Sequence, residues 1–361
     1  MKKLTTISDY ALHTEKKREF LKRYGVAFVF LAPFLFFFLL FCVYPLFYGI
    51  VMSLFKFNIA DYTQNEWRGL KNFITLLFSY SNTYYQNFWY SMKNTLWFVV
   101  ILVPLAIVVP LVMAILVNAQ PKGYKIFRAI IYLPSILPVS ASGVIFVSLF
   151  GTNFGYLNQW MGTTIDWLGG VETAKLVIIL LCMWGGWGGN FIILSAGLKN
   201  VNKSLYEAAS VDGCVGFRRT LAVTLPAIKQ QLVLCIFTTI IGYFGLYGQV
   251  YVLTNGGPNI DVNGQAYGAT MTIMWYLQSC IQGGNFNVYG MVSAMGLLLG
   301  AFIGILTGIQ LWLTRDKKSG TKISAQFSQY IAQKKLSTAT QSATTVTADT
   351  VQDAAKEKDN E

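Results

Sequence analysis

The chain has 361 residues, of which 54% are hydrophobic and only 12% are charged. An average soluble domain carries about 25% charged residues, so this composition favours a protein that lies in a lipid bilayer. The formal net charge of +12 does not indicate a nucleic-acid partner, because the basic residues stand between long apolar runs and not on one polar face. Five scattered cysteines and a single histidine argue against disulfides, a metal site and histidine catalysis.

Six apolar stretches are long enough to cross a membrane, since a helix needs about 20 apolar residues to span about 30 Å of hydrocarbon. None of them contains Asp, Glu, Lys, Arg or His. The sequence therefore predicts an all-α polytopic membrane protein with six transmembrane helices. The first stretch is too long for a signal-peptide core, and we expect the mature protein to retain it. The six stretches cover residues 25–52, 95–117, 129–150, 176–197, 230–253 and 289–313.

The distribution of basic residues predicts the orientation of these helices. Seven Lys and Arg precede the first stretch, three lie between the second and third, five between the fourth and fifth, and eight follow the sixth, which makes 23 of the 28. The positive-inside rule then places both termini in the cytoplasm and the protein in the cytoplasmic (inner) membrane, surrounded by lipid. The short apolar segment 267–280 is expected outside, along the membrane surface.

Three regions follow from these patterns. Residues 1–24 form a basic cytoplasmic segment, and residues 25–314 form the six-helix transmembrane domain. Residues 315–361 are rich in Ser, Thr, Ala, Gln and Lys, which cannot bury enough apolar area to offset the entropy of ordering. We predict a disordered cytoplasmic tail.

The cytoplasmic segment between the fourth and fifth stretches has the pattern of a helical hairpin. Ser204 and Glu207 have the spacing of a capping box, which predicts that a helix begins at Ser204. Gly213 can adopt the left-handed conformation that ends such a helix, and Pro226 suits the start of the next one. A solvated connecting loop is an equally good interpretation of these local features alone.

The same segment resembles the signature loop of the permeases of binding-protein-dependent ABC importers: EAA, three residues, G, nine residues, then I-x-L-P. It reads Glu207-Ala208-Ala209, Gly213 and Val223-Thr224-Leu225-Pro226, with Val in place of Ile. Residues 69–73, 154–158 and 253–259 also resemble the carbohydrate branch of that family, the maltose and glycerol-phosphate type. The likeness covers about residues 25–315. Asn202 replaces a usual proline, and there is no large inserted external domain.

The resemblance implies the maltose-type (type I) importer permease fold, with a coupling loop at about residues 199–228 that docks on a cytoplasmic ATPase. It also implies a second homologous permease, two ATPase subunits that bind ATP and Mg, and an external sugar-binding protein. A heterodimer of permeases is the expected arrangement. The predicted coupling residues are Ser204, Glu207, Ala208, Ala209, Asp212, Gly213, Leu225 and Pro226.

Two stretches carry groups that suit a sugar. Thr239, Tyr243, Leu246 and Tyr247 fall on one stripe of a continuous fifth helix. Residues 182–191 place Trp184, Trp187 and Phe191 on one face, beside glycines and the Asn190 amide. Pattern alone favours ordinary helix packing. The resemblance, however, puts seven residues at sugar-holding positions: Gly185, Gly186, Gly189, Thr239, Gly242, Tyr243 and Leu246. The full set of substrate-pathway candidates adds Trp184, Trp187, Asn190 and Tyr247.

Two other classes of function remain as alternatives. No GxxxxGK[ST] phosphate loop occurs, so ATP would be bound by separate subunits. An ion-gradient-driven secondary sugar carrier would need an intramembrane carboxylate or histidine for protons, although sodium coupling through carbonyls stays possible. No constellation of paired carboxylates or Ser/His/Asp residues indicates a membrane enzyme, and we expect a transporter subunit with no catalytic residues.

Overall fold

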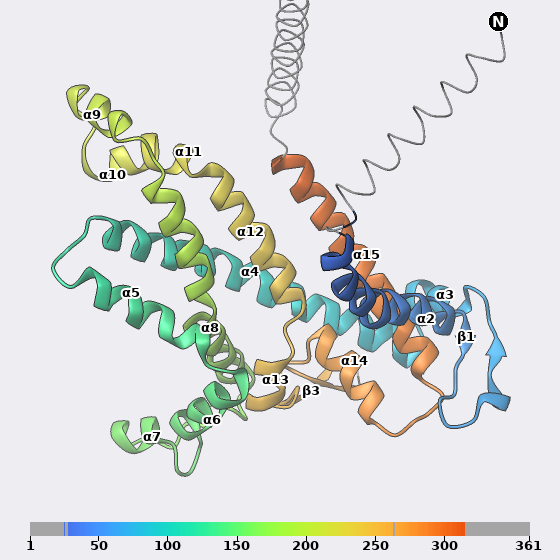
Figure 1. The fold of residues 1–361 in the computed structure, drawn as a ribbon. Coiled ribbons are helices and arrows are strands. Elements are labelled where there is room, and N and C mark those ends of the chain that lie inside the picture. Colours follow the sequence, from blue (N-terminus) through green and yellow to red (C-terminus); the bar gives the residue numbers. More distant parts are fainter. Residues whose placement is uncertain (1–24, 26–27, 263, 315–361) are drawn as a thin grey trace, which may run out of the picture. The chain divides into compact units, whose positions relative to one another are not determined.

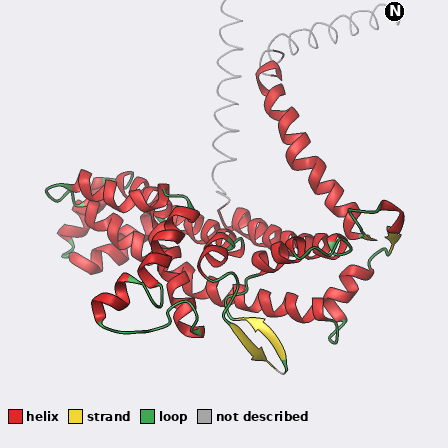
Figure 2. Ribbon diagram, turned by 90° about the horizontal axis from the view of Figure 1, so that it is seen from below, coloured by secondary structure: helices red, strands yellow, loops and turns green. Residues whose placement is uncertain are grey.

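The computed structural model describes residues 25, 28–262 and 264–314. The predicted basic segment 1–24 and the predicted disordered tail 315–361 lie outside the described residues. The chain divides into two units, Met1–Gly308 and Ile309–Glu361, and the described part of the second is the end of the last helix. The described chain is mostly helical, with two short antiparallel strand pairs (Figures 1 and 2).

The elements follow each other in chain order through short connections. The first part contains the helix Phe28–Ser53, which includes η1 (Leu39–Val43) and α2 (Tyr44–Ser53), then β1 (Phe55–Lys56), η2 (Tyr62–Gln64), β2 (Glu66–Trp67), α3 (Lys71–Phe78), α4 (Thr83–Asn118), α5 (Tyr124–Tyr132), η3 (Leu133–Ile136), α6 (Val139–Phe150) and α7 (Tyr156–Met161). The second part contains α8 (Val171–Lys199), α9 (Lys203–Val211), α10 (Gly216–Arg219), η4 (Thr220–Thr224), α11 (Leu225–Ala227), α12 (Lys229–Phe244), α13 (Gly248–Leu253), β3 (Asn259–Val262), β4 (Gln265–Gly268), α14 (Ile273–Gln282) and α15 (Tyr289–Thr314).

Four of these helices are long and apolar enough to cross a membrane, and the number rises to six if each of two bent helix pairs is one span. One pair, Tyr124–Ile136 with Val139–Phe150, bends by 97° at a proline-containing break. The other, Gly216–Ala227 with Lys229–Phe244, bends by 76°. The expectation of one continuous helix over 230–253 is wrong, because α12 ends at Phe244 and α13 starts at Gly248.

The core lies where α8 packs against α4 and α12. One buried cluster, which includes Phe191, Leu194 and Ile228, joins α4, α8 and the start of α12. A second, around Phe98 and Ile178, joins α4, α6, α8 and α13. In Figure 1, α9 and α10 lie at one end of α8 and α12, and α6, α7 and α13 lie toward the other end. The hairpin and the break in α12 are therefore at opposite ends of the same two helices.

The N-terminal helix presents its apolar side chains outward. None of its most apolar window is buried, and Phe30 and Phe41 are 82% and 68% exposed. Water would disfavour such a surface by about 25 cal/mol per Å² of apolar area. The helix is suited to contact with lipid or with another apolar surface.

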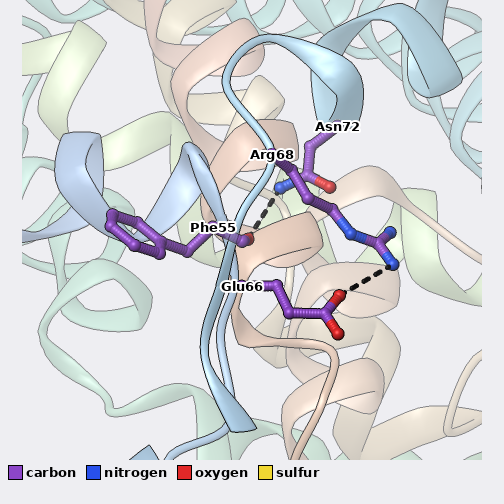
Figure 3. A network of polar contacts seen from close by, with 4 residues as sticks. All are labelled: Phe55, Glu66, Arg68 and Asn72. Carbon is purple, nitrogen blue, oxygen red and sulfur yellow. Dashed lines mark hydrogen bonds and ion pairs between the residues drawn. The ribbon is translucent and has the colours of Figure 1, made fainter.

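A buried asparagine fixes the connection between α2 and α3. The Asn72 Nδ2 group donates to the backbone carbonyl of Ser53 at 2.7 Å. It also donates to the carbonyl of Phe55 at 2.9 Å (Figure 3). The neighbouring Arg68 and Glu66 approach to 3.9 Å, but Glu66 is exposed and Arg68 only half-buried, so this ion pair adds little. Asn72 belongs to the segment 69–73 on which part of the family resemblance rests.

The connection between α6 and α8 is closed in a similar way. Asn158 is buried and donates to the carbonyls of Thr152 and Ile165, at 3.0 and 2.8 Å. The Thr152 hydroxyl donates to Asp166, and this bond, with a second from the Gly169 amide, holds the pKa of Asp166 below its usual range. These short-range bonds make the loop compact, and it carries no large insertion.

The segment 267–280 packs more deeply than a surface helix would. Its N-terminal part is strand β4, and its C-terminal part is helix α14, on which Ile273 and Tyr276 are buried in one cluster with α4 and α15. The Asn94 amide of α4 donates to the carbonyls of Ala269, at 2.9 Å, and Met271, at 3.0 Å. The Ile273 amide donates to the Thr95 hydroxyl.

Replacing Asn94 by leucine tests this attachment. The change leaves two buried carbonyls without their donor, and we expect a loss of about 1–3 kcal/mol in the free energy of unfolding. Thermal unfolding of the purified protein in detergent measures it. Ser148→Ala is the control, because Ser148 is exposed and its hydroxyl donates only to Val144 of its own helix. An unchanged midpoint for Asn94→Leu would show that the attachment does not stabilise the fold.

Candidate functional site

A cavity of about 340 Å³ opens between α8 and α12, next to the break that separates α12 from α13. Its walls contain backbone, hydroxyl, phenol and amide groups and carry no charge. Seven of the eleven substrate-pathway candidates line it. The lining residues are Gly186, Gly189, Asn190, Thr238, Thr239, Gly242, Tyr243, Gly245, Leu246 and Gln249.

One hydrogen-bond network crosses the wall of the cavity. The Asn190 Nδ2 group donates to the Thr239 hydroxyl at 2.9 Å and to the Ala106 carbonyl at 2.8 Å. These bonds tie α8 to α12 and α4 with an amide that is 8% exposed. Because both amide hydrogens are used, the Asn190 side chain can offer only its oxygen to a ligand.

Glycines on α8 make room for the cavity. Gly186, Gly189 and Asn190 stand at i, i+3 and i+4 and therefore share one face of the helix. A Cβ at Gly186 would lie 3.1 Å from the Tyr243 hydroxyl, whereas a Cβ at Gly189 would meet nothing within 4 Å. Gly186 thus allows the phenol to approach α8, and Gly189 leaves open space.

The break in α12 exposes backbone to the cavity. The chain leaves helical geometry at residues 245–247, and the Thr272 hydroxyl donates to the Leu246 carbonyl at 2.6 Å. The predicted single stripe is therefore wrong beyond Tyr243. Leu246 still lines the cavity, but Tyr247 stacks on Tyr251 with ring centroids 5.4 Å apart and is not among the lining residues.

The predicted aromatic platform on α8 does not face the cavity. Trp184 packs near Phe146, with ring centroids 5.8 Å apart, and Phe191 is fully buried in another cluster. Trp187 does not line the cavity, and its indole N–H has no partner among the described residues. Gly185 also lies outside the lining. The reason is helix rotation, since the cavity takes the face of Gly186, Gly189 and Asn190, whereas Trp187 points to the side of that face and Trp184 nearly to the opposite side of the helix.

Three lining residues escaped the sequence analysis: Thr238, Gly245 and Gln249. The signal for two of them was present, because two glycines three residues apart, Gly245 and Gly248, mark a helix break. A break turns the following residues to a new face, which brings Gln249 to the cavity. Thr238 precedes Thr239, and only the packing of α12 could place it.

The N-cap of the first hairpin helix, α9, lies two residues earlier than predicted. Asn202, and not Ser204, is the N-cap of α9, and its side-chain oxygen accepts from the Ser204 amide at 3.0 Å. The capping box of Ser204 with Glu207 is therefore wrong. Asparagine is as good a cap as serine, so the substitution of the usual proline supplies the cap.

The end of α9 agrees with the role expected of glycine. Gly213 has φ of +68°, its amide donates to the Ser210 carbonyl, and the Cys214 amide donates to the Ala209 carbonyl at 2.8 Å. This pair of bonds is the Schellman motif, which requires a left-handed residue just past the helix. Any larger side chain at Gly213 would be strained.

Burial divides the predicted coupling residues into two groups. Exposed residues are Ser204, Glu207, Ala208, Asp212, Gly213 and Pro226. Ala209 is only 7% exposed and is therefore not part of the surface that the hairpin presents. Leu225 is half-buried, and Pro226 lies inside α11 before the bend and not at the start of α12.

The geometry defines a helical membrane protein with an uncharged polar cavity at a broken span. No group of three or more His, Cys, Asp or Glu that could hold a metal ion occurs in the part of the chain that the structure describes. Residues 106–319 match the family described as binding-protein-dependent transport system inner membrane component. The chain belongs to this family, which confirms the resemblance inferred from the sequence.

Several curated relatives align over most of their length. The chain is 29% identical over 313 residues to the arabinooligosaccharides transport system permease protein AraP of Bacillus subtilis, covering 83% of this chain and 91% of that one. It is 28% identical to the lactose transport system permease protein LacF of Rhizobium radiobacter, over 83% of this chain and 98% of that one. Both are permeases and not enzymes, in agreement with the expectation for this chain.

The fold is shared with a solved importer. A chain of the bacterial alginate ABC transporter, in complex with an alginate pentasaccharide-bound periplasmic protein, superimposes with a TM-score of 0.67 at 21% identity. The match covers 82% of this chain and 96% of that one. At this level of identity the likeness shows the fold.

Filling the cavity from α8 tests whether it is the site of transport. Gly189→Leu projects a side chain into open space in the cavity, so we expect normal folding and at least about tenfold slower uptake, as a blocked site loses binding. Gly185→Leu is the matched control, because a Cβ there also meets nothing within 4 Å but does not line the cavity. Uptake of radiolabelled sugar by cells, at equal membrane expression, gives the comparison. Equal uptake by the two variants would move the site elsewhere.

Proposed function

We propose that this chain is a transmembrane permease subunit of an ATP-driven, binding-protein-dependent importer of sugars, either oligosaccharides or related polyols and sugar derivatives. The observation that carries the proposal is the uncharged polar cavity at the break in α12, in a chain that belongs to the permease family. The permease catalyses no covalent chemistry and forms half of the translocation pathway.

The cavity suits a neutral sugar. A sugar presents hydroxyls that exchange hydrogen bonds and C–H faces that rest on apolar or aromatic surfaces, and the lining offers Thr239, Tyr243 and Leu246 for these contacts. Its volume falls within the range of small-molecule sites, about 300–1,000 Å³. Relatives named for arabinooligosaccharides and lactose support this substrate class.

We infer that a second, homologous permease closes the other side of the pathway, as a heterodimer. Gly189 and Thr238 line the cavity and are exposed in the single chain. A backbone and hydroxyl surface of this kind is unfavourable against hydrocarbon, which cannot hydrogen-bond. A partner with its own polar face would satisfy it.

The hairpin of α9 and α10 is the proposed contact with one of two cytoplasmic ATPase subunits, which bind ATP and Mg. Val211 and Phe217 are 89% and 76% exposed beside the charged Glu207 and Asp212. An exposed apolar patch with a polar rim is typical of a protein interface. This arrangement supports the coupling role that the resemblance assigns to the loop.

The proposed topology sets on which side of the membrane each partner lies. We propose six spans in the cytoplasmic membrane, with both termini inside and an extracytoplasmic sugar-binding protein delivering substrate to the outer face. ATP and the loaded binding protein would each favour the outward-facing state, so that each strengthens the effect of the other. The alternative of an ion-gradient-driven carrier predicts uptake that does not need the ATPases.

The deciding measurement is sugar-stimulated ATP hydrolysis by the reconstituted complex. Glu207→Lys reverses an exposed charge on the hairpin, and we expect it to reduce stimulation at least about tenfold or to release the ATPase subunits, because a truncated interfacial charge pair costs about 2–5 kcal/mol. Glu172→Lys is the matched control, since Glu172 is an exposed glutamate at the other end of α8. Uptake that continues without ATP in the Glu207 variant would support a gradient-driven carrier.

A further inference from the structure

A single aromatic side chain connects the two arms of the hairpin. Tyr206, on α9, lies with its ring 5.6 Å from the Arg219 guanidinium, within cation–π range. Its hydroxyl donates to the Thr224 hydroxyl at 3.3 Å. Tyr206 is half-buried and Thr224 is buried, whereas neighbouring Leu205 and Glu207 are exposed. Tyr206 therefore faces the second arm and not the surface offered to a partner.

The two contacts of Tyr206 end on residues close to the bend that precedes α12. Arg219 ends α10, and Thr224 ends the π-helix η4, directly before α11 and the 76° bend into α12. Single π-helical turns are rare and concentrate at functional positions. Tyr206 thus reaches from the middle of α9 to the end of η4. The Thr224 carbonyl accepts from the Ile228 amide, directly before α12, whose far end lines the cavity.

Gly213 and Gly216, with φ of +68° and +59°, flank the turn between α9 and α10. The two backbone bonds of the Schellman motif hold the end of α9, and side-chain contacts across the hairpin add to them in fixing the angle between the two arms. At the membrane end, α8 and α12 already approach closely, because a Cβ at Gly197 would lie 2.9 Å from the Gln231 side chain.

We propose that Tyr206 is a positioning residue that braces α9 against η4, the turn that leads through α11 into α12, so that a displacement of α9 moves α12 and the cavity wall. The proposal rests on the proposed function, in which the hairpin contacts an ATPase. Tyr206 does not contact the ATPase itself. Without the brace, α9 would pivot at its glycine turn, and ATP hydrolysis would continue without productive transport.

The test uses the full complex with its ATPases and binding protein, and measures sugar molecules imported per ATP hydrolysed. For Tyr206→Ala we expect that ratio to fall at least about fivefold, the scale of a typical coupling between sites, while the ATPase subunits stay bound and hydrolysis continues. Ser148→Ala, which removes an exposed hydroxyl outside the hairpin that donates only to the Val144 carbonyl of its own helix, leaves the ratio unchanged.

Conservative variants distinguish a loss of the brace from a folding defect. Tyr206→Phe and Thr224→Val remove the same hydrogen bond, so each lowers the ratio by a similar smaller factor, and the double variant is no worse than either. Additive losses would overturn the brace, as would a normal ratio in Tyr206→Ala. Release of the ATPases by Tyr206→Ala would place the residue in the docking surface and overturn it too.

The Glu207→Lys variant separates failure of this inference from failure of the proposed function. A normal ratio in Tyr206→Ala with lost stimulation in Glu207→Lys refutes only the brace. Normal ATPase binding and stimulation in both refute the coupling role of the hairpin.

Discussion

Backbone groups inside a bilayer need partners within the protein, since hydrocarbon offers none. The break between α12 and α13 interrupts the ladder of helical hydrogen bonds next to the cavity. Thr272 donates to the carbonyl of Leu246 and so satisfies one of the groups released by the break. Asn94 and Thr95 of α4 hold the chain on both sides of Thr272. The polar loop between β4 and α14 is therefore a structural requirement of the break.

The cavity is a consequence of the same constraint. A continuous α12 would pack its side chains against α8 along its whole length, and the Gly186 to Tyr243 approach indicates how close that packing is. Because the helix stops at Phe244, Gly245 and Gln249 enter the lining from a new direction. Polarity then comes from neutral hydroxyl, phenol and amide groups and from backbone, with no buried charge to neutralise.

Sequence reasoning picked out much of the cavity lining because periodicity survives within one helix. Asn190, from its local pattern, and Thr239 and Tyr243, from pattern and family resemblance, all line the cavity. It failed for Trp184 and Trp187, since the rotation of α8 depends on its neighbours α4 and α12, which the local sequence does not encode. The choice of Asn202 over Ser204 as helix cap has a similar cause. Both residues can cap, and the end of α8 at Lys199 decides between them.

The neutrality of the cavity limits how transport can be driven. A site lined by no Asp, Glu, His, Lys or Arg has no side chain that ordinarily relays protons in a membrane carrier. Under the proposed function, direction must therefore come from a partner that binds one state of the permease more tightly than the other. Both helices that line the cavity are connected to the hairpin, α8 to α9 through residues 200–202 and α12 to η4 through α11 and the 76° bend. Under the proposed function, one movement of the hairpin would therefore reach both walls of the cavity through these two connections.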